Sequence, residues 1–147
     1  MSKEQFIFEK KIYLKDINLY GTAYFARYFE WQGEAREEFF KSAVSDYITF
    51  LNSGIILITK AASMEYIHEV KALDTLIIVI TIGNVTRASF EMIFAYKNKK
   101  NDTVLAKGKQ KILFANKDGK IIPIPDIIKE VGRKYLNPVQ KAFLKLT

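Results

Sequence analysis

One long apolar segment sets the strongest limit on how this chain can fold. From Thr22 to Ala43 the sequence contains no proline and only one glycine, Gly33. The apolar residues between Ala23 and Trp31 point in nearly every direction around a helix, which is the pattern of a helix buried on all sides. The sequence therefore predicts a helix over residues 22–43 that other elements must surround.

The rest of the chain supplies strands that can surround such a helix. Runs of β-branched and aromatic residues recur between turn signals rich in Asp, Asn and Gly. The runs are Phe6–Leu14 before the helix and Ile55–Glu69, Thr75–Arg87, Ser89–Lys99 and Thr103–Asn116 after it, and two short terminal helices are predicted over Ile127–Tyr135 and Pro138–Leu146. This order predicts an α+β domain in which a five-stranded antiparallel sheet curls around one long buried helix, the arrangement called the hot-dog fold.

The size of the chain and the open edges of such a sheet bear on its organisation. At 147 residues the chain is predicted to form a single domain, residues 1–147. A sheet packed on one helix leaves unpaired edges, and a two-fold partner can cover them. We therefore expect a homodimer, and a dimer of dimers as the larger assembly.

The composition excludes several kinds of chemistry. The chain has no cysteine, so disulfides, thiolate nucleophiles and cysteine-ligated metal sites are excluded, and we expect no metal. The N-terminus lacks a charged region followed by an apolar one, and no stretch of about 18 uncharged apolar residues occurs. We expect a cytoplasmic protein without membrane insertion.

The chain is basic, with 23 Lys and Arg against 16 Asp and Glu and a formal net charge of +7. This balance favours polyanionic partners such as phosphorylated cofactors, nucleic acids or acidic carrier proteins. No helix-turn-helix, zinc-finger or RNA-recognition pattern occurs, so nucleic acid is not an expected partner. Lys107, Lys109 and Lys111 alternate along one predicted strand and are interpreted as a solvated sheet face, with phosphate contact as the alternative.

The segment Asp16–Thr22 carries the clearest chemical signal. It reads as a turn leading into the predicted helix, whose first N–H groups have no intrahelical partner and lie at the positive end of the helix dipole. Gly21 would let a substrate carbonyl approach the backbone, where these donors could stabilise an oxyanion. The alternative is that Gly21 only makes the turn and that Asn18 or Asp16 caps it.

A resemblance to a known family begins in this segment. The residues from Asp16 to Phe29 closely resemble the active-site segment of the 4-hydroxybenzoyl-CoA thioesterase family of hot-dog proteins, and those from Trp31 to Glu37 are similar to its enediyne polyketide thioesterases. Further similar positions are Tyr66, Leu73–Leu76, Ala106–Gly108 and Gly119–Pro125. The resemblance implies a hydrolase of acyl-CoA or acyl-carrier-protein thioesters in polyketide or fatty acid metabolism. No cofactor is expected, since CoA or phosphopantetheine would enter as part of the substrate.

One position departs from the larger family. Where that family has a catalytic aspartate this chain has Asn18, which neither takes a proton at pH 7 nor readily forms an anhydride. The enediyne group also has asparagine here and an arginine matching Arg36, which implies a mechanism without an acidic catalytic residue. Thr22 stands where that group usually has asparagine.

The turn and the resemblance together predict a set of site residues. The expected catalytic residues are Asn18, Gly21, Thr22 and Arg36, and the expected substrate-binding residues are Tyr20, Tyr24, Phe25, Tyr28 and Gln32. Backbone N–H groups near Gly21 and Thr22 would hold the thioester carbonyl, and Asn18 would hydrogen-bond the carbonyl or the attacking water. Asp16 and Glu34 are candidate bases whose alternative roles are structural, and His68 is interpreted as a structural or surface residue.

Arg36 lies on a helix predicted to be largely buried, so its guanidinium must be paired or must face a polar cavity. A salt bridge is the structural alternative. On a straight helix Arg36 would lie about 20 Å from the first turn, too far to reach the oxyanion site of its own chain. A two-fold dimer could bring it to Asn18 of the other chain, where it would bind a substrate carbonyl or carboxylate.

Two other functions share this fold. A non-catalytic acyl-thioester binding protein is one alternative, because Asn18 could mark a lost activity. Hot-dog hydratases and dehydratases are the other, because their motif also begins Asp-x-Asn. That motif continues with proline and histidine, whereas this chain has Leu19 and Tyr20.

Overall fold

The computed structural model describes residues 5–136. The strands are β1 (Phe6–Lys11), β2 (Ile56–Tyr66), β3 (Thr75–Gly83), β4 (Ser89–Asn98), β5 (Val104–Ala115) and β6 (Ile121–Ile122). The helices are α1 (Arg27–Ala43), α2 (Tyr47–Leu51) and α3 (Asp126–Tyr135), with a 3-10 turn over Leu14–Asp16. All strand pairs are antiparallel in the order β1-β3-β4-β5-β2, and the short β6 pairs with β5. The predicted α+β hot-dog fold is confirmed, with β6 as a sixth strand beside the five expected.

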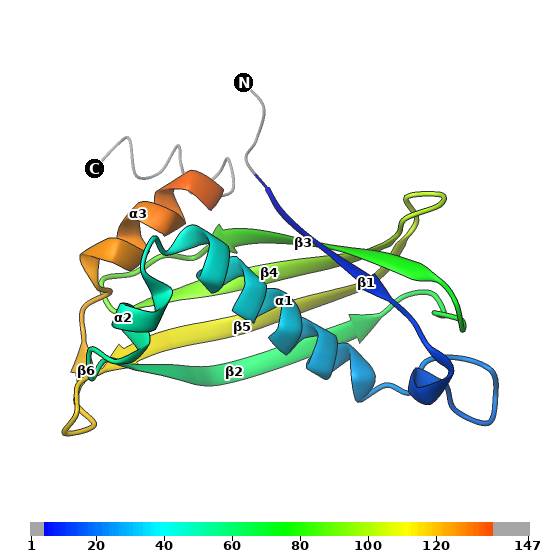
Figure 1. Ribbon diagram of the computed structural model, residues 1–147, viewed down its shortest axis with the longest axis horizontal. Helices are drawn as coiled ribbons and strands as arrows, with labels where there is room; N and C mark the ends of the chain where they lie inside the picture. The colour runs from blue at the N-terminus through cyan, green and yellow to red at the C-terminus, as the bar shows by residue number, and fades with distance from the viewer. Residues whose placement is uncertain (1–4, 137–147) are drawn as a thin grey trace.

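Helix α1 lies across the concave face of the curved sheet (Figure 1). Its buried residues recur every three or four positions, as one face of a helix requires: Tyr28, Trp31, Gln32, Ala35, Phe39 and Phe40. The opposite side of α1 is exposed at Glu30, Glu34 and Glu37. The expectation of a helix buried on all sides is therefore wrong, because α1 is buried only where it meets the sheet.

Helix α1 also begins five residues later than predicted, at Arg27 rather than Thr22. The residues before it are held in extended pairings with distant parts of the chain. Thr22 forms an isolated β-bridge with Lys71, and the N–H of Ala23 donates to the carbonyl of Val70 at 2.8 Å. These non-local bonds override the local helical pattern, so the turn at 18–22 is separated from the start of α1.

The other elements differ from the prediction mainly at their ends. Strands β1, β2 and β3 end three or four residues earlier than predicted, at Lys11, Tyr66 and Gly83, and α3 follows the predicted Ile127–Tyr135 closely. The short helix α2 was not predicted, and the predicted helix Pro138–Leu146 lies outside the described residues. None of the helices among residues 5–136 is both long and apolar enough to cross a membrane.

Tyr96 ties the sheet to the first turn of α1. It is fully buried in β4, and its hydroxyl donates to the backbone oxygen of Tyr28 at 2.6 Å. Tyr96→Phe is expected to lower the free energy of unfolding by about 1–3 kcal/mol, because a buried carbonyl loses this partner. Urea denaturation measures the change. Tyr20→Phe, at a side chain that is 90% exposed, is the matched control, and an equal loss in both variants would contradict the prediction.

Candidate active site

Asn18 organises the turn that precedes α1. Its Oδ1 accepts hydrogen bonds from the backbone N–H of Tyr20 at 2.9 Å and of Thr22 at 3.4 Å. Gly21 has a φ of 83°, in the left-handed region that glycine adopts without strain. Because Oδ1 is used inside the turn and no described residue accepts from Nδ2, the amide N–H₂ is the part of Asn18 left to bind another molecule.

The backbone donors expected at Gly21 and Thr22 are already used. The N–H of Gly21 donates to the carbonyl of Asn18 at 3.1 Å, and that of Thr22 donates to Asn18 Oδ1. Neither belongs to the first turn of a helix, so the expectation that they form its free N-terminal donors is wrong. Among residues 5–136, the N–H groups of Phe25, Ala26 and Tyr28 donate to no acceptor, and these are the free donors at the start of α1.

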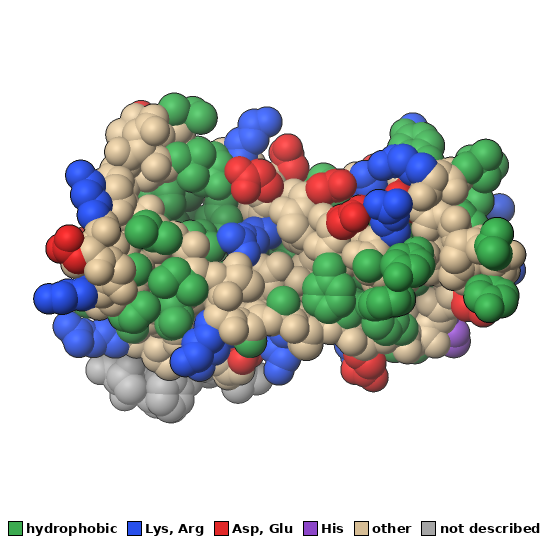
Figure 2. All heavy atoms as spheres, turned by 90° about the horizontal axis from the view of Figure 1, so that it is seen from below, with side chains coloured by type: hydrophobic (Ala, Val, Ile, Leu, Met, Phe, Trp, Pro, Cys, Tyr) green, Lys and Arg blue, Asp and Glu red, His purple; other side chains and the backbone are tan. Residues whose placement is uncertain are grey.

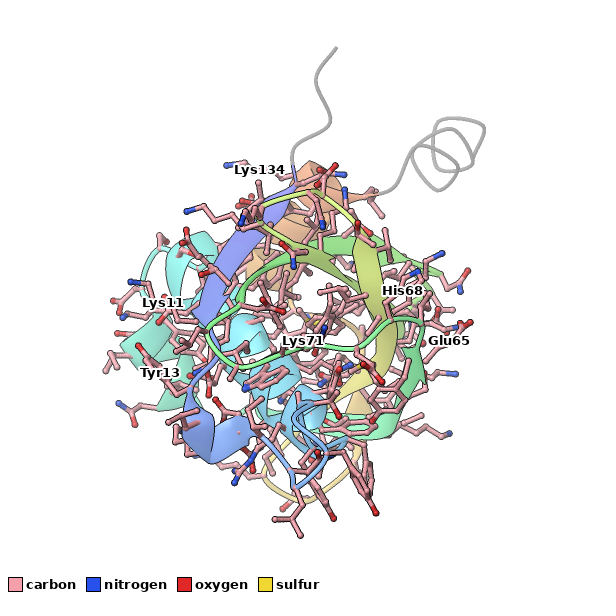
Figure 3. All side chains as sticks on the ribbon, turned by 90° about the vertical axis from the view of Figure 1, so that its right-hand side faces the viewer. Lys11, Tyr13, Glu65, His68, Lys71 and Lys134 are labelled. Atoms are coloured by element: carbon pink, nitrogen blue, oxygen red, sulfur yellow. The ribbon has the colours of Figure 1, made fainter. Side chains whose placement is uncertain are left out.

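A cavity of about 250 Å³ adjoins these free donors. Thr22, Phe25 and Tyr28 line it from the N-terminal side, and Tyr66 and His68 line it from the end of β2. Figure 3 views this end of the molecule, with Tyr13 on the β1 side and His68 on the β2 side of the curved sheet. The structure thus brings three of the predicted site residues together around one hollow.

The tyrosines at this cavity are donors rather than bases. Burial, together with the neighbouring Tyr66, raises the pKa of Tyr28 to about 12. Burial also raises the pKa of Tyr66, whose hydroxyl donates to the backbone oxygen of Phe25 at 2.8 Å. Both hydroxyls therefore stay protonated at neutral pH, and the bond from Tyr66 holds the chain at Phe25 in place.

Arg36 lies further along α1, about 14 Å from Arg27 along the helix axis. Its Nη1 donates to Thr59 Oγ1 and to Gln110 Oε1, the latter at 3.0 Å. No carboxylate of the described residues forms a salt bridge with Arg36, and burial lowers the pKa of its guanidinium. The structural alternative for Arg36 was a salt bridge, and none forms with it among residues 5–136. A half-buried cation that forms no salt bridge with the described part of the chain is suited to binding an anionic or strongly polar group.

A β-bulge directs Thr59 toward Arg36. The pairing of β2 with β5 shifts between Thr59 and Ala61, which leaves Lys60 as the extra residue. Thr59 pairs with the buried Ile112, whereas Ala61 pairs with the exposed Lys111, so the two β2 residues face opposite sides of the sheet. In a regular strand residues two apart share a face. The bulge therefore places the Thr59 hydroxyl on the face that α1 covers.

Gln32 does not contact the cavity described above. Its side chain is fully buried, its Nε2 donates to the carbonyl of Ser63 at 3.4 Å, and its Oε1 accepts from Gln110 Nε2 at 2.8 Å. Since both ends are occupied, this geometry does not support direct substrate contact. Gln110 and Thr59 were not predicted. The sequence could have indicated Gln110, because it is the one amide on a predicted strand face whose other members are Ala106, Gly108, Ile112 and Phe114.

The two candidate bases have structural partners. Asp16 is 1% exposed, and its Oδ2 accepts from the backbone N–H of Tyr13 at 3.1 Å. Glu34 pairs with Lys10 at 2.9 Å on the outer side of α1. The geometry supports the structural interpretation for both carboxylates.

The face along β2 is rich in exposed apolar side chains. Figure 2 shows this face, with hydrophobic side chains gathered toward both of its ends. The exposed aromatic residues next to the turn are Tyr20, Tyr24, Phe25, Phe29 and Tyr66. In the sheet order β2 is a terminal strand, with β5 as its one neighbour among the described residues. A second, apolar cavity of about 340 Å³ lies between the end of α1 and α3 and is lined by Phe39, Phe40, Phe90 and Ile128.

Comparison with known proteins identifies the family. Residues 12–132 match the model of the thioesterase-like superfamily. The chain belongs to this superfamily. A putative esterase of Aquifex aeolicus (strain VF5) is 27% identical over 126 residues, covering 86% of this chain and 96% of that protein.

Solved structures of other proteins share this fold. The dynemicin thioesterase superposes with a TM-score of 0.85 at 22% identity, covering 91% of this chain and 99% of that one. The 1,4-dihydroxy-2-naphthoyl-CoA thioesterase of Synechocystis superposes with a TM-score of 0.80 at 20% identity, covering 88% and 96%. Membership in the thioesterase-like superfamily supports hydrolysis of acyl thioesters as the general activity.

Proposed function

We propose that this protein hydrolyses an acyl thioester of CoA or of an acyl carrier protein, with no acidic residue at the position of Asn18. The observation that carries the proposal is that the oxygen and the nitrogen of the Asn18 side-chain amide have different roles. Its oxygen holds the turn, and its amide N–H₂ is free beside the cavity-lining segment 22–28. An amide N–H₂ is a donor, so it can bind a carbonyl oxygen but cannot remove a proton.

In the proposed reaction, Asn18 Nδ2 and the free N–H groups at Phe25, Ala26 and Tyr28 provide the donors for the thioester oxygen. Water adds to the carbonyl carbon, and the negative charge that develops on oxygen is stabilised by these donors. The carbon–sulfur bond then breaks, the acid is released, and the thiolate takes up the proton that the water loses. A thiolate is a good leaving group, so positioning and oxyanion stabilisation replace a strong general base.

Arg36 has the second role in this proposal, on a substrate bound by the other subunit of a homodimer. Its unpaired half-buried charge suits a substrate carbonyl or carboxylate, and with a β-ketoacyl substrate it would hold the released acid as carbon dioxide leaves. The distance along α1 separates it from the turn of its own chain. The unpaired edge of β2 and the exposed aromatic residues beside it supply a surface that a two-fold partner can cover.

The thiol carrier of the proposed substrate is CoA or an acyl carrier protein. The net charge of +7 favours both the phosphates of CoA and the acidic surface of a carrier protein. The name of the Synechocystis relative refers to an aromatic acyl-CoA, and that of the dynemicin relative to polyene binding. Both names support an acyl group with an extended or aromatic apolar part.

An assay of free-thiol release tests the enzymatic claim. Short, aromatic and long acyl groups are offered on CoA and on a carrier protein, and release is followed with a thiol reagent. Because the chain has no cysteine, the enzyme itself contributes no signal. We expect release from at least one series. Tight binding without release from any of them would show a binding protein instead.

Mixed subunits test the shared site. Asn18→Ala and Arg36→Ala are each expected to lower activity about 100-fold or more, to a small residual rate. Unfolding and refolding an equimolar mixture should yield about half heterodimers by random pairing, each with one intact site, and about one quarter of wild-type activity. The refolded single variants are the controls. Failure of the mixture to recover activity, with heterodimers present, would contradict the contribution of Arg36 from the partner subunit.

A further inference from the structure

We propose that Gln110 and Gln32 form a buried relay that positions the Arg36 guanidinium, which makes both amides positioning residues of the active site. This inference rests on the function proposed for Arg36. It assigns roles to a residue of β5 and a residue of α1 that do not contact the reacting atoms.

The hydrogen-bond directions of the relay are fixed by Arg36. A guanidinium only donates, so Gln110 must turn its Oε1 toward Arg36 Nη1, which lies 3.0 Å away. The Nε2 of Gln110 then points at Gln32 and donates to its Oε1 at 2.8 Å. This leaves Nε2 of Gln32 to donate to the carbonyl of Ser63 at 3.4 Å. Each amide is therefore held in one orientation, from the cation to the backbone of β2.

Burial makes the relay sensitive to the loss of any member. Gln32 is 0% exposed and Gln110 is 6% exposed, so water does not readily replace a missing partner. Among residues 5–136 every buried side-chain nitrogen and oxygen has a hydrogen-bond partner. Removing one amide would leave the next without its bond and free to rotate.

The sheet makes room for this relay at Gly108. A Cβ built on Gly108 would collide with Nε2 of Gln32 and would lie 3.2 Å from the Ser63 carbonyl. Gly108 pairs with Met64 of β2 and sits two residues before Gln110 on the same strand face. A larger residue at position 108 would push the Gln32 amide away from both of its partners.

The relay and Thr59 together fix one nitrogen of Arg36 and leave the others available. Nη1 is held between the Thr59 hydroxyl and the Gln110 amide oxygen. No described residue accepts a hydrogen bond from Nη2 or Nε. Since the guanidinium is planar, fixing Nη1 from two directions also fixes the plane in which the other donors are offered.

A double-mutant cycle tests whether Gln110 acts through Arg36. Gln110→Met keeps the approximate side-chain length and removes both hydrogen bonds, and we expect kcat/KM for thioester hydrolysis to fall about 10- to 100-fold, mostly in kcat. In an Arg36→Ala background the same change should have no further effect on kcat/KM. A loss of the same factor in both backgrounds would overturn the inference, as would no loss in either.

Matched variants separate positioning from general damage. Lys109→Met introduces the same side chain on the exposed face of the same strand and should leave kcat/KM unchanged. Gly108→Ala should lower kcat about as Gln110→Met does, by displacing Gln32. A loss of activity in Lys109→Met equal to that in Gln110→Met would overturn the inference.

A second measurement does not depend on activity. In the wild-type protein we expect slowed rotation of the Arg36 guanidinium, seen as separate NMR signals for its Nη hydrogens, and averaged signals in Gln110→Met. If the wild type releases no thiol, the proposed function fails while this measurement still tests the relay. Identical signals in the two proteins would overturn the inference on their own.

Discussion

Asn18→Asp is expected to lower kcat by about 100- to 1,000-fold, the effect of losing one donor to an oxyanion. The change is nearly isosteric. Aspartate keeps an oxygen that can accept from the N–H groups of Tyr20 and Thr22, so the turn should survive. What is lost is the Nδ2 donor, and a carboxylate in its place repels the negative charge that develops on the substrate oxygen. Steady-state thiol release with the preferred substrate measures the loss.

Asn18→Ala is the comparison for this variant, because it removes the donor and the turn acceptor together. We expect Asn18→Ala to lower the urea midpoint by an amount that reflects the lost hydrogen bonds from the N–H groups of Tyr20 and Thr22, whereas Asn18→Asp leaves it unchanged. A gain of activity in Asn18→Asp would contradict the prediction. It would mean that the site can run the carboxylate mechanism of the larger family once the aspartate is restored.

Arg36→Ala is expected to lower kcat/KM by about 100- to 1,000-fold, because a half-buried guanidinium contributes strong, charge-assisted hydrogen bonds to a substrate. The free energy of unfolding should change little. The lost bonds to Thr59 and Gln110 are offset by relief of a half-buried charge that forms no salt bridge with a described carboxylate. A large loss of stability with a small loss of activity would contradict the role in substrate binding.

Arg36→Lys adds a dependence on pH. Burial lowers the pKa of the guanidinium at position 36, and the same burial would lower the pKa of a lysine there below its ordinary value of about 10.4. The lysine is charged below its pKa and neutral above it. Activity of Arg36→Lys should therefore fall as the pH rises through that pKa, whereas the wild-type profile has no such fall from position 36, since arginine remains protonated.

The arrangement of the fold was accessible from the sequence because local patterns and long-range packing agree over most of the chain. In β5 the exposed Lys107, Lys109 and Lys111 alternate with buried neighbours, as a strand with one solvated face requires. The start of α1 is where they disagree. Thr22 and Ala23 have a helical apolar pattern, but pairings with Lys71 and Val70, some fifty residues away in sequence, hold them extended. No pattern in the local sequence predicts such long-range contacts.

The candidate site likewise contains residues that the local sequence predicts and residues that only long-range packing brings together. Asn18, Thr22, Phe25 and Tyr28 were predicted from a continuous segment, and the structure brings the last three to one cavity beside the Asn18 turn. The partners of Arg36 were not predicted. They come from two other strands, and the inward direction of Thr59 depends on a bulge at Lys60 that a reading of strict alternation misses.

The bulge at Lys60 also affects which strands can join the sheet. The outer edge of β2 is eleven residues long, and an edge of that length is a template for any extended chain. The extra residue breaks the repeat of its hydrogen-bonding groups near the middle of the strand. A regular foreign strand can pair on one side of the break or the other but not along the whole edge. The irregularity that aims Thr59 at Arg36 thus also protects the molecule against indiscriminate association, while a second copy of this chain carries a matching irregularity.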